Sequence, residues 1–429
     1  MSLLSPVGRS IVYNETHKSK ISAETTMTQL HDYNHFAGRH WETGSVANYF
    51  AYRGVQAPHT GEPYSEALLL GVSGGAVMGY FSFSYEGYDP MARILTRNTF
   101  DPWDTMLSRL GVAQNVHQTA KPDTAVRNLL AALEEGTPAI VWADMWSLLY
   151  NNLEWDKGMW AMFPVLVYGY DANADRVLIA DRARVGLSAT TGELAAARVR
   201  AKNAKHRLIT LEAPDPAKLP AAVSAGIWDC IRLYTEPPPK GSKNNFGLAA
   251  LRWWAELLTK PKVRLSWERE FPAGPKMLAG LVSSYSDIAL FGKEIGDYAE
   301  RGRYAAFLDE AAVLLNRPLL REAATQFRAA AVEWGRLAGM LFPDGVAPLA
   351  ETRDLLDRRQ AAFLERGNEA RPEMAAIDAR LAAIKTSFAS EFPMTPAEVV
   401  AHRVALAGQI MAIHDVEAAA VETLKTAMA

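Results

Sequence analysis

The residues best suited to chemistry lie near the start of the chain, in a polar stretch that leads into a predicted helix. His40 and Glu42 precede a helix expected to begin at Thr43 or Gly44 and to end at Gly54. Histidine exchanges protons near neutral pH, and a helix N-terminus presents unpaired N–H groups that stabilise negative charge. His40 is therefore a candidate general base, and Glu42 is either its acid partner or a residue that only complements the helix dipole.

His31 and His35 form another histidine pair, with the i, i+4 spacing that places two metal ligands on one helix face. The segment 34–38 is a poor helix former, and no glutamate follows His31 as it does in zinc proteases. Hydrogen bonding to loop backbone is the favoured interpretation. We predict no metal site and no cofactor.

A second candidate region connects two predicted strands and holds four tryptophans, two methionines and several acids. Connections of this length are more often functional than merely structural. Trp142, Trp146 and Trp160 could line a ligand pocket, and Asp144 or Asp156 could bind an amine. The alternative is an aromatic minicore that packs against a helical domain or a dimer partner, and both interpretations stay open.

The single cysteine, Cys230, excludes an internal disulfide framework and a cysteine-based zinc site within one chain. It lies on the apolar face of a predicted helix at 219–233. A free cysteine in such a place is usually a small core residue, so we predict that Cys230 is not a nucleophile.

The composition excludes several classes of protein. The chain has 429 residues, of which 49% are hydrophobic and 22% charged, so two domains with large cores are expected. A formal net charge of −3 gives no basic field, and neither nucleic acid nor a membrane is an expected partner. The segment 1–20 lacks a signal peptide's apolar run, and no window is expected to reach the length of a membrane span. These features predict a cytoplasmic protein.

Alternating strand and helix signals predict an α+β fold for the first half of the chain. After an irregular or extended segment at 1–29 and the helix that begins at Thr43 or Gly44, a short helix is expected at 64–71, with Ser65 as its cap. Further helices are expected at 102–110 and 124–135. Strands are expected at 77–84, 92–96, 137–144, 163–171 and 176–181, the last two joined by a hairpin turn at 172–175.

A proline-rich and then polar segment, 236–245, is typical of a linker. Beyond it the strand signals end, and alanine-rich amphipathic patterns predict a bundle of helices at 246–258, 276–300, 304–315, 319–341, 349–366, 373–388 and 397–428. We therefore expect one domain at 1–236 and an α-helical domain at 246–429.

Several short motifs, in their order and spacing, resemble the butirosin biosynthesis protein H family. Four segments of this chain resemble its N-terminal domain: 38–40, 65–67, 71–75 and 167–171. Three further segments resemble its helical C-terminal domain: 245–247, 253–254 and 307–312. The resemblance extends from about His31 to Phe342. It implies a papain-like fold and a cysteine-dependent transfer of an aminoacyl group from a carrier-protein thioester to an aminoglycoside amine.

That chemistry needs a thiolate nucleophile, an imidazole and an acid that orients the imidazole. In the resemblance, Trp41 stands at the cysteine position and Phe163 at the histidine position, and only Asp181 matches the orienting acid. An indole cannot form a thioester and a phenyl ring cannot carry a proton. The resemblance therefore implies that this triad does not catalyse, and that Trp41 and Phe163 face each other across the former cleft.

Three functions follow as hypotheses. The first is a non-catalytic member that binds a small amine, acyl or peptide-like ligand between Trp41, Phe163 and the tryptophan-rich connection. The second is acyl transfer or amide hydrolysis without a covalent intermediate, with His40 as general base near Asp181 or Glu42. The third is an interaction or scaffold protein. A small-molecule ligand or acyl donor is the expected partner, and a second copy of the chain is a further candidate. An open cleft beside Trp41 favours the first two, and a filled one the third.

Overall fold

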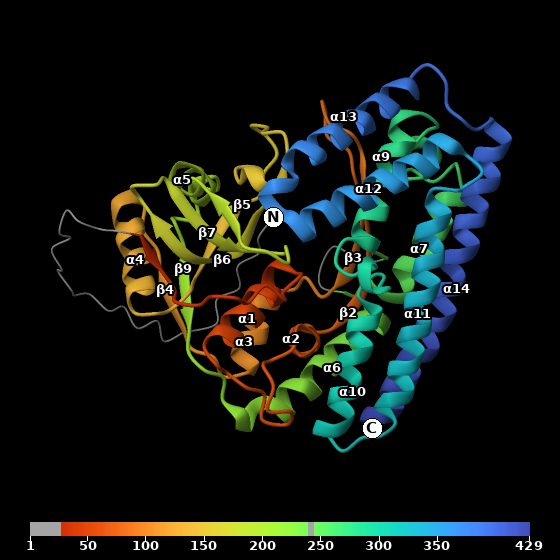
Figure 1. Cartoon of the computed structure of the whole chain (residues 1–429). Helices are drawn as coiled ribbons and strands as arrows, with labels where there is room; N and C mark the ends of the chain where they lie inside the picture. The colour runs from red at the N-terminus through yellow and green to blue at the C-terminus, as the bar shows by residue number, and fades with distance from the viewer. Residues whose placement is uncertain (1–26, 239–243) are drawn as a thin grey trace.

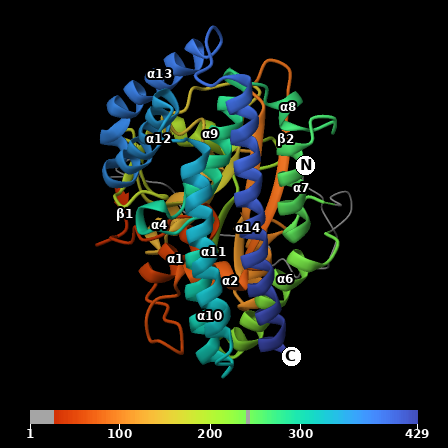
Figure 2. The same cartoon turned by 90° about the vertical axis from the view of Figure 1, so that its right-hand side faces the viewer.

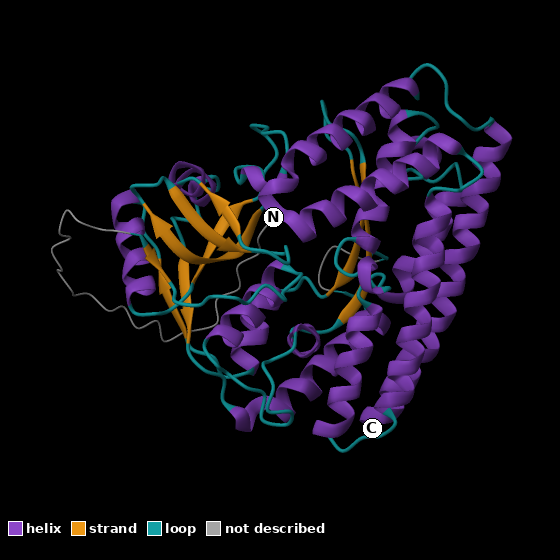
Figure 3. Ribbon diagram, in the orientation of Figure 1, coloured by secondary structure: helices purple, strands orange, loops and turns teal. Residues whose placement is uncertain are grey.

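The structure is a computed structural model that describes residues 27–238 and 244–429. A part rich in strands lies beside a larger helical part (Figures 1 and 3). The expected irregular segment at 1–29 and the expected linker at 236–245 lie partly outside the described residues. The mixed sheet and helices confirm the α+β class.

Nine strands are described, each with its bounds as follows: β1 (Thr28–Gln29), β2 (Ala76–Phe83), β3 (Met91–Arg97), β4 (Gln114–His117), β5 (Ala139–Asp144), β6 (Met162–Asp171), β7 (Arg176–Ala180), β8 (Leu187–Ala189) and β9 (Leu208–Leu211). The α-helices of the first half are α1 (Trp41–Tyr52), α2 (Glu66–Val72), α3 (Pro102–Arg109), α4 (Pro122–Glu134), α5 (Thr191–Val199) and α6 (Leu219–Thr235). Those of the second half are α7 (Gly247–Thr259), α8 (Trp267–Glu270), α9 (Pro275–Ala289), α10 (Arg301–Leu314), α11 (Leu320–Leu341), α12 (Ala347–Arg366), α13 (Arg371–Ser387) and α14 (Pro396–Met428).

The larger sheet has the strand order β4-β9-β5-β6-β7-β8, and β1 pairs with β6. All of its described pairings are antiparallel. The hairpin predicted at 172–175 is present between β6 and β7, with Asp171 opposite Arg176. The expected strands match β2, β3, β5, β6 and β7, whereas β4, β8 and β9 were not predicted because three or four residues give too short a pattern.

The hairpin β2–β3 forms a separate two-stranded sheet, which packs against α7 and α9 in the helical part (Figure 2). Buried side chains form two clusters. One combines the larger sheet and α1 with parts of α10, α11 and α14, and the other combines β2 and β3 with α7, α9 and α11. Both clusters therefore draw on residues before and after the expected boundary at 236–246, and the division into two domains stays a prediction.

The expected helix at 276–300 is shorter in the structure. Helix α9 ends at Ala289, and Ala299 and Glu300 adopt left-handed backbone angles just before α10. Left-handed residues cannot continue a right-handed helix, so the chain turns here. This turn brings Phe291 and Glu300 to the start of α1, as described below.

Helix α14 corrects another expectation. It contains an 18-residue window with mean hydropathy 1.3 and passes for a membrane-crossing helix by length and composition alone. The expectation that no window reaches this length is therefore wrong for α14. In the structure, α14 packs against α7 and α11 and 39% of the window is buried. The core helix of a protein that does not enter a membrane can have the same composition, so composition does not decide whether α14 crosses one. The expected partners and the expected cytoplasmic location therefore stay predictions.

Candidate functional site

The start of α1 is capped by His40. The helix begins at Trp41, not at the expected Thr43 or Gly44, because the Nδ1 atom of His40 accepts a hydrogen bond from the backbone N–H of Glu42 at 3.2 Å. A side-chain acceptor at this position satisfies one of the unpaired N–H groups of the first turn. Trp41 is therefore the first helical residue, the position at which a reactive side chain gains most from the helix N-terminus.

Two glycines let the preceding loop cross the first turn of α1. A Cβ atom on Gly38 would lie 2.4 Å from the carbonyl oxygen of Gly44, and one on Gly44 would lie 2.8 Å from the backbone nitrogen of Arg39. The carboxylate of Glu66, in the first turn of α2, accepts hydrogen bonds from the backbone N–H groups of Arg39 and His40, each at 2.8 Å. The loop is thereby fixed between α1 and α2.

Trp41 and Phe163 stack on each other. Their ring centroids are 4.0 Å apart with an interplanar angle of 11°, which confirms the predicted contact between these two residues. Phe291, from the segment after α9, packs edge-on against Trp41 at 5.3 Å and lies 4.8 Å from the ring of His40. These four rings, His40, Trp41, Phe163 and Phe291, form what we call the aromatic cluster. These rings pack against one another directly beside the start of α1.

Arg182 connects Asp181 to the aromatic cluster. Its guanidinium carbon lies 4.6 Å from the ring centroid of Trp41 and 4.9 Å from that of Phe363. Asp181 is 5% exposed, and its carboxylate accepts hydrogen bonds from Arg182 and, at 3.2 Å, from the hydroxyl of Tyr150. The acid predicted to orient a histidine is thus linked to Trp41 through Arg182 but is already bonded to Tyr150 and Arg182.

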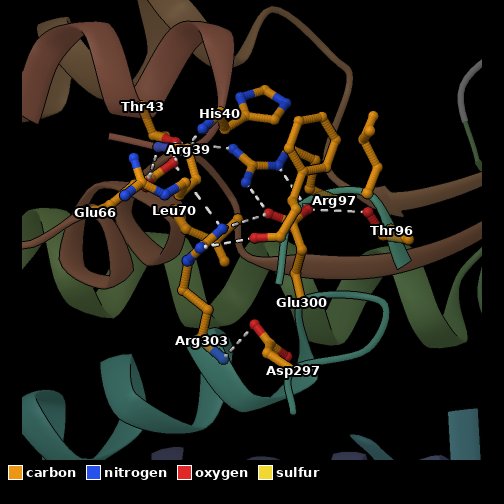
Figure 4. Close-up of polar contacts among 12 residues, drawn as sticks. Arg39, His40, Thr43, Glu66, Leu70, Thr96, Arg97, Asp297, Glu300 and Arg303 are labelled. Atoms are coloured by element: carbon orange, nitrogen blue, oxygen red, sulfur yellow. Dashed lines mark hydrogen bonds and ion pairs between the residues drawn. The ribbon is translucent and has the colours of Figure 1, made fainter. Parts of the chain in front are cut away.

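A network of charged residues surrounds the other side of His40. Figure 4 shows the carboxylate of Glu300 between the guanidinium groups of Arg97 and Arg303, with N–O distances of 2.8 and 3.1 Å. Arg97 also donates to the hydroxyl of Thr43 at 3.0 Å. Although burial raises the pKa of Glu300, Arg97 holds it well below its usual value. The network therefore remains charged at neutral pH and ties α1 to β3 and α10.

This environment makes His40 neutral. Burial and the nearby Arg97 lower the pKa of His40 well below 6.5, although Glu300 opposes the shift. Because Nδ1 accepts the N–H of Glu42, the proton of the neutral ring resides on Nε2. Nε2 can then donate a hydrogen bond but cannot accept a proton. The general-base role stays a prediction, and the capping bond opposes it.

Glu42 differs from the other acids around α1. Among the described residues, none makes a hydrogen bond or ion pair with its carboxylate. Burial raises the pKa of Glu42 to about 7, while Arg97 lowers it and Asp101 raises it further. Glu42 is therefore partly protonated at neutral pH.

This shift predicts how Glu42 affects stability. In the unfolded chain Glu42 titrates near 4.5, so between about pH 4.5 and 7 the folded state binds the additional proton, and stability falls as the pH rises through this range. We expect Glu42→Gln to match the wild type at pH 4 and to exceed its free energy of unfolding by about 3 kcal/mol at pH 8. Urea denaturation at both pH values measures this. An equal difference at the two pH values would contradict it.

The tryptophan-rich connection does not join the aromatic cluster as one pocket. Trp142 packs edge-on against Trp103 at 4.9 Å, and the guanidinium carbon of Arg207 lies 4.4 Å from its ring centroid. In the register of β5 and β6, Phe163 lies opposite Ala143 and not opposite Trp142. Neighbouring residues of a strand point to opposite faces, so Trp142 and Phe163 face different sides of the sheet.

The acids of this connection stabilise its own backbone. Asp144 is fully buried and accepts hydrogen bonds from the N–H and hydroxyl of Ser147 and from the N–H of Ala161. Asp156 accepts bonds from the Tyr88 hydroxyl, at 2.8 Å, and from two backbone N–H groups. Trp146 is half-buried, and Trp160 is 51% exposed. A role for these residues in ligand binding stays a prediction.

Cys230 lies where a core residue is expected. Its side chain is fully buried and its Sγ donates to the carbonyl oxygen of Ala76 at 3.1 Å. Burial raises the pKa of the thiol to about 12, so the nucleophilic thiolate is scarce at neutral pH.

Within residues 27–238 and 244–429, no group of three or more His, Cys, Asp and Glu side chains lies close enough together to hold a metal ion. His31 is exposed and lies 2.6 Å from Asp32, and His35 packs against Tyr33 and Tyr52. The prediction of no metal and no cofactor remains a prediction.

The fold and site describe an α+β protein in which an aromatic stack occupies the start of the first major helix. Residues 40–182 match the family model described as butirosin biosynthesis protein H, N-terminal. Over this stretch the chain is similar to the butirosin biosynthesis protein H family, which supports the resemblance found in the sequence. No curated protein matches the chain.

Sequence reasoning did not find Arg182 or Phe291 as residues of the site. Arg182 directly follows Asp181 in the sequence, and this position next to a candidate residue was the only feature that could have pointed to Arg182 as part of the site. Phe291 lies in a segment that was expected to be helical, far along the chain, and no local pattern connects it with Trp41.

Proposed function

We propose that this protein is a member of a secondary-metabolite acyltransferase-type family that has lost thiol catalysis and binds a small amine, acyl or peptide-like ligand. The observation that supports this proposal most is the stack of Trp41 on Phe163 at the N-terminus of α1. In a papain-like arrangement, the nucleophile and the base occupy these two positions. Neither ring can form an acyl bond or carry a proton.

The same surroundings suit a cationic ligand. Trp41 and Phe163 are half-buried, and the ring of Trp41 already attracts one cation, the guanidinium group of Arg182. Glu42, in the first turn of the same helix, carries a carboxylate without a protein partner. An amine with an apolar body is therefore the ligand class that these residues favour. Its affinity should rise as the pH increases through 7, because Glu42 then ionises.

An interaction or scaffold protein is the second candidate. Its support is a group of exposed aromatic side chains on the β2–β3 hairpin loop and the tryptophan-rich connection: Phe83, Tyr85, Tyr88, Trp155 and Trp160. Tyr88 joins the two segments through Asp156. This candidate requires no ligand at Trp41.

Two measurements test the proposal. The wild-type protein is incubated with an aminoacyl thioester of N-acetylcysteamine, and its intact mass is recorded. We expect no acyl adduct in the wild type or in Cys230→Ser. A stable adduct, or turnover that His40→Ala abolishes, would overturn the non-catalytic proposal.

The second measurement is a titration with phenethylamine, monitored by NMR at pH 6 and pH 8. We expect tighter binding at pH 8 than at pH 6, and we expect Glu42→Gln to remove the difference. Binding that is the same in Glu42→Gln and wild type would exclude Glu42 from the ligand site and leave the scaffold candidate favoured.

A further inference from the structure

A second site lies apart from the aromatic cluster, between α4, β6 and α5. A cavity of about 240 Å³ opens there. Its floor is made by buried apolar side chains, including Ala125, Leu129 and Leu194, and its rim includes the exposed residues Pro122 and Ala195. None of the four residues of the aromatic cluster lines it.

A buried arginine without a counter-ion forms part of the wall. Arg198 is 2% exposed, and one of its terminal nitrogens donates to the carbonyl oxygen of His206 at 2.6 Å. Its Nε atom has no hydrogen-bond partner. In the described part of the chain, no carboxylate lies within ion-pairing distance of Arg198, although most other buried arginines of this protein are paired with acids.

The charge of Arg198 persists at neutral pH. Burial lowers the pKa of its guanidinium to about 10, and the nearby Tyr170 is the group that opposes this shift. A buried charge that lacks a partner is costly, and such charges are normally paired. An anion in the cavity would supply the missing partner.

His206 adds a second unsatisfied group to the same wall. It is 4% exposed, its Nε2 atom has no hydrogen-bond partner, and its backbone is left-handed with φ of 47°. Burial, followed by the charge of Arg198, lowers the pKa of its ring. Strained backbone and unpaired buried polar atoms in one wall are more typical of ligand sites than of structural cores.

We propose that this cavity binds a small carboxylate with an apolar body, whose carboxylate pairs with Arg198 and His206 and whose body contacts Leu129 and Leu194. Guanidinium groups bind carboxylates through short charge-assisted hydrogen bonds. A cavity of about 150 Å³ holds a benzene ring, so the volume present accommodates a ring together with a carboxylate. Benzoate is thus a suitable probe.

The test compares benzoate with its neutral isostere benzamide by calorimetric titration of the full chain. We expect benzoate to bind at least about tenfold more tightly, because only the anion compensates Arg198. Equal affinities of the two compounds, or no binding of benzoate, would overturn the proposal.

Variants locate the binding in the cavity. Arg198→Met retains much of the side-chain volume and removes the charge, and we expect it to weaken benzoate binding by at least about tenfold. Arg127→Met, on the exposed face of α4, is the matched control and should leave the affinity unchanged. Since Arg198 also bonds to His206, Ala195→Phe provides a second variant that narrows the rim without touching the charge. If benzoate binds both Arg198→Met and Ala195→Phe as it binds the wild type, the site is not this cavity.

Discussion

Truncating either member of the buried pair Arg301–Glu417 is expected to destabilise the protein by about 3–5 kcal/mol. Both side chains are fully buried, and the Nε of Arg301 lies 2.6 Å from a carboxylate oxygen of Glu417. Glu417 also accepts hydrogen bonds from Trp334, at 2.7 Å, and from Tyr234, at 2.9 Å. Removing one charge leaves the other in an apolar interior without compensation, which costs more than the pair itself contributes.

The ion pair connects several elements of the fold, so its loss should affect all of them. Arg301 begins α10, Glu417 lies on α14 and Tyr234 lies in the last turn of α6. Arg301 also donates to the carbonyl oxygen of Thr96 on β3 at 2.9 Å. One ion pair thus joins three helices to the hairpin that enters the helical part.

Urea denaturation of four variants measures the effect. Glu417→Leu and Arg301→Met should each cost about 3–5 kcal/mol, and the double variant should cost less than their sum because it leaves no unpaired charge. Glu351→Gln breaks the exposed pair with Arg380 and is the matched control, with an expected cost below about 1 kcal/mol. A loss in Glu417→Leu no larger than in the control would show that the buried pair is not important for stability.

A second large effect is expected from two substitutions that supply a nucleophile and a base at the start of α1. Replacing Trp41 by cysteine and Phe163 by histidine is expected to produce a protein that accepts an acyl group from a thioester. Residue 41 is the first of α1, and Arg182 lies beside its ring, so both the helix terminus and a cation would favour a thiolate there. The two rings now stack at 4.0 Å, so an imidazole at residue 163 would lie near the new thiol.

The single variant Trp41→Cys provides the comparison. It lacks a base, and general-base catalysis contributes on the order of 100-fold or more, so its acylation should be slower than that of the double variant by about that factor. Asp181 is bonded to Tyr150 and Arg182 and does not freely orient a new histidine, so turnover should stay low even where the adduct forms. The measurement is intact mass over time with an aminoacyl thioester. Equal acylation rates of the single and double variants would show that residues 41 and 163 do not form the nucleophile and base positions.

The sequence alone was sufficient for most local structure. Ser65, followed by Glu66, predicts the start of α2, and the Ser65 hydroxyl caps it in the structure by accepting the N–H of Leu68 at 2.9 Å. The turn at 172–175 predicts the β6–β7 hairpin, and short ordered motifs predict the family that matches at 40–182. These features depend on residues that are close in sequence, whose propensities and hydrogen bonds act within a few positions.

The tertiary structure decided which side chains meet. His40 became a helix cap, because its Nδ1 accepts the backbone N–H of Glu42 in a geometry that only the folded loop allows. Phe291 and Glu300 reach α1 from the second half of the chain, and Trp142 turns away from Phe163 although the two strands are neighbours. The packing of α5 against the sheet leaves the Nε of Arg198 and the Nε2 of His206 buried without hydrogen-bond partners. Such contacts join residues far apart in sequence, and their pairing depends on packing and burial, which no local pattern of residues specifies.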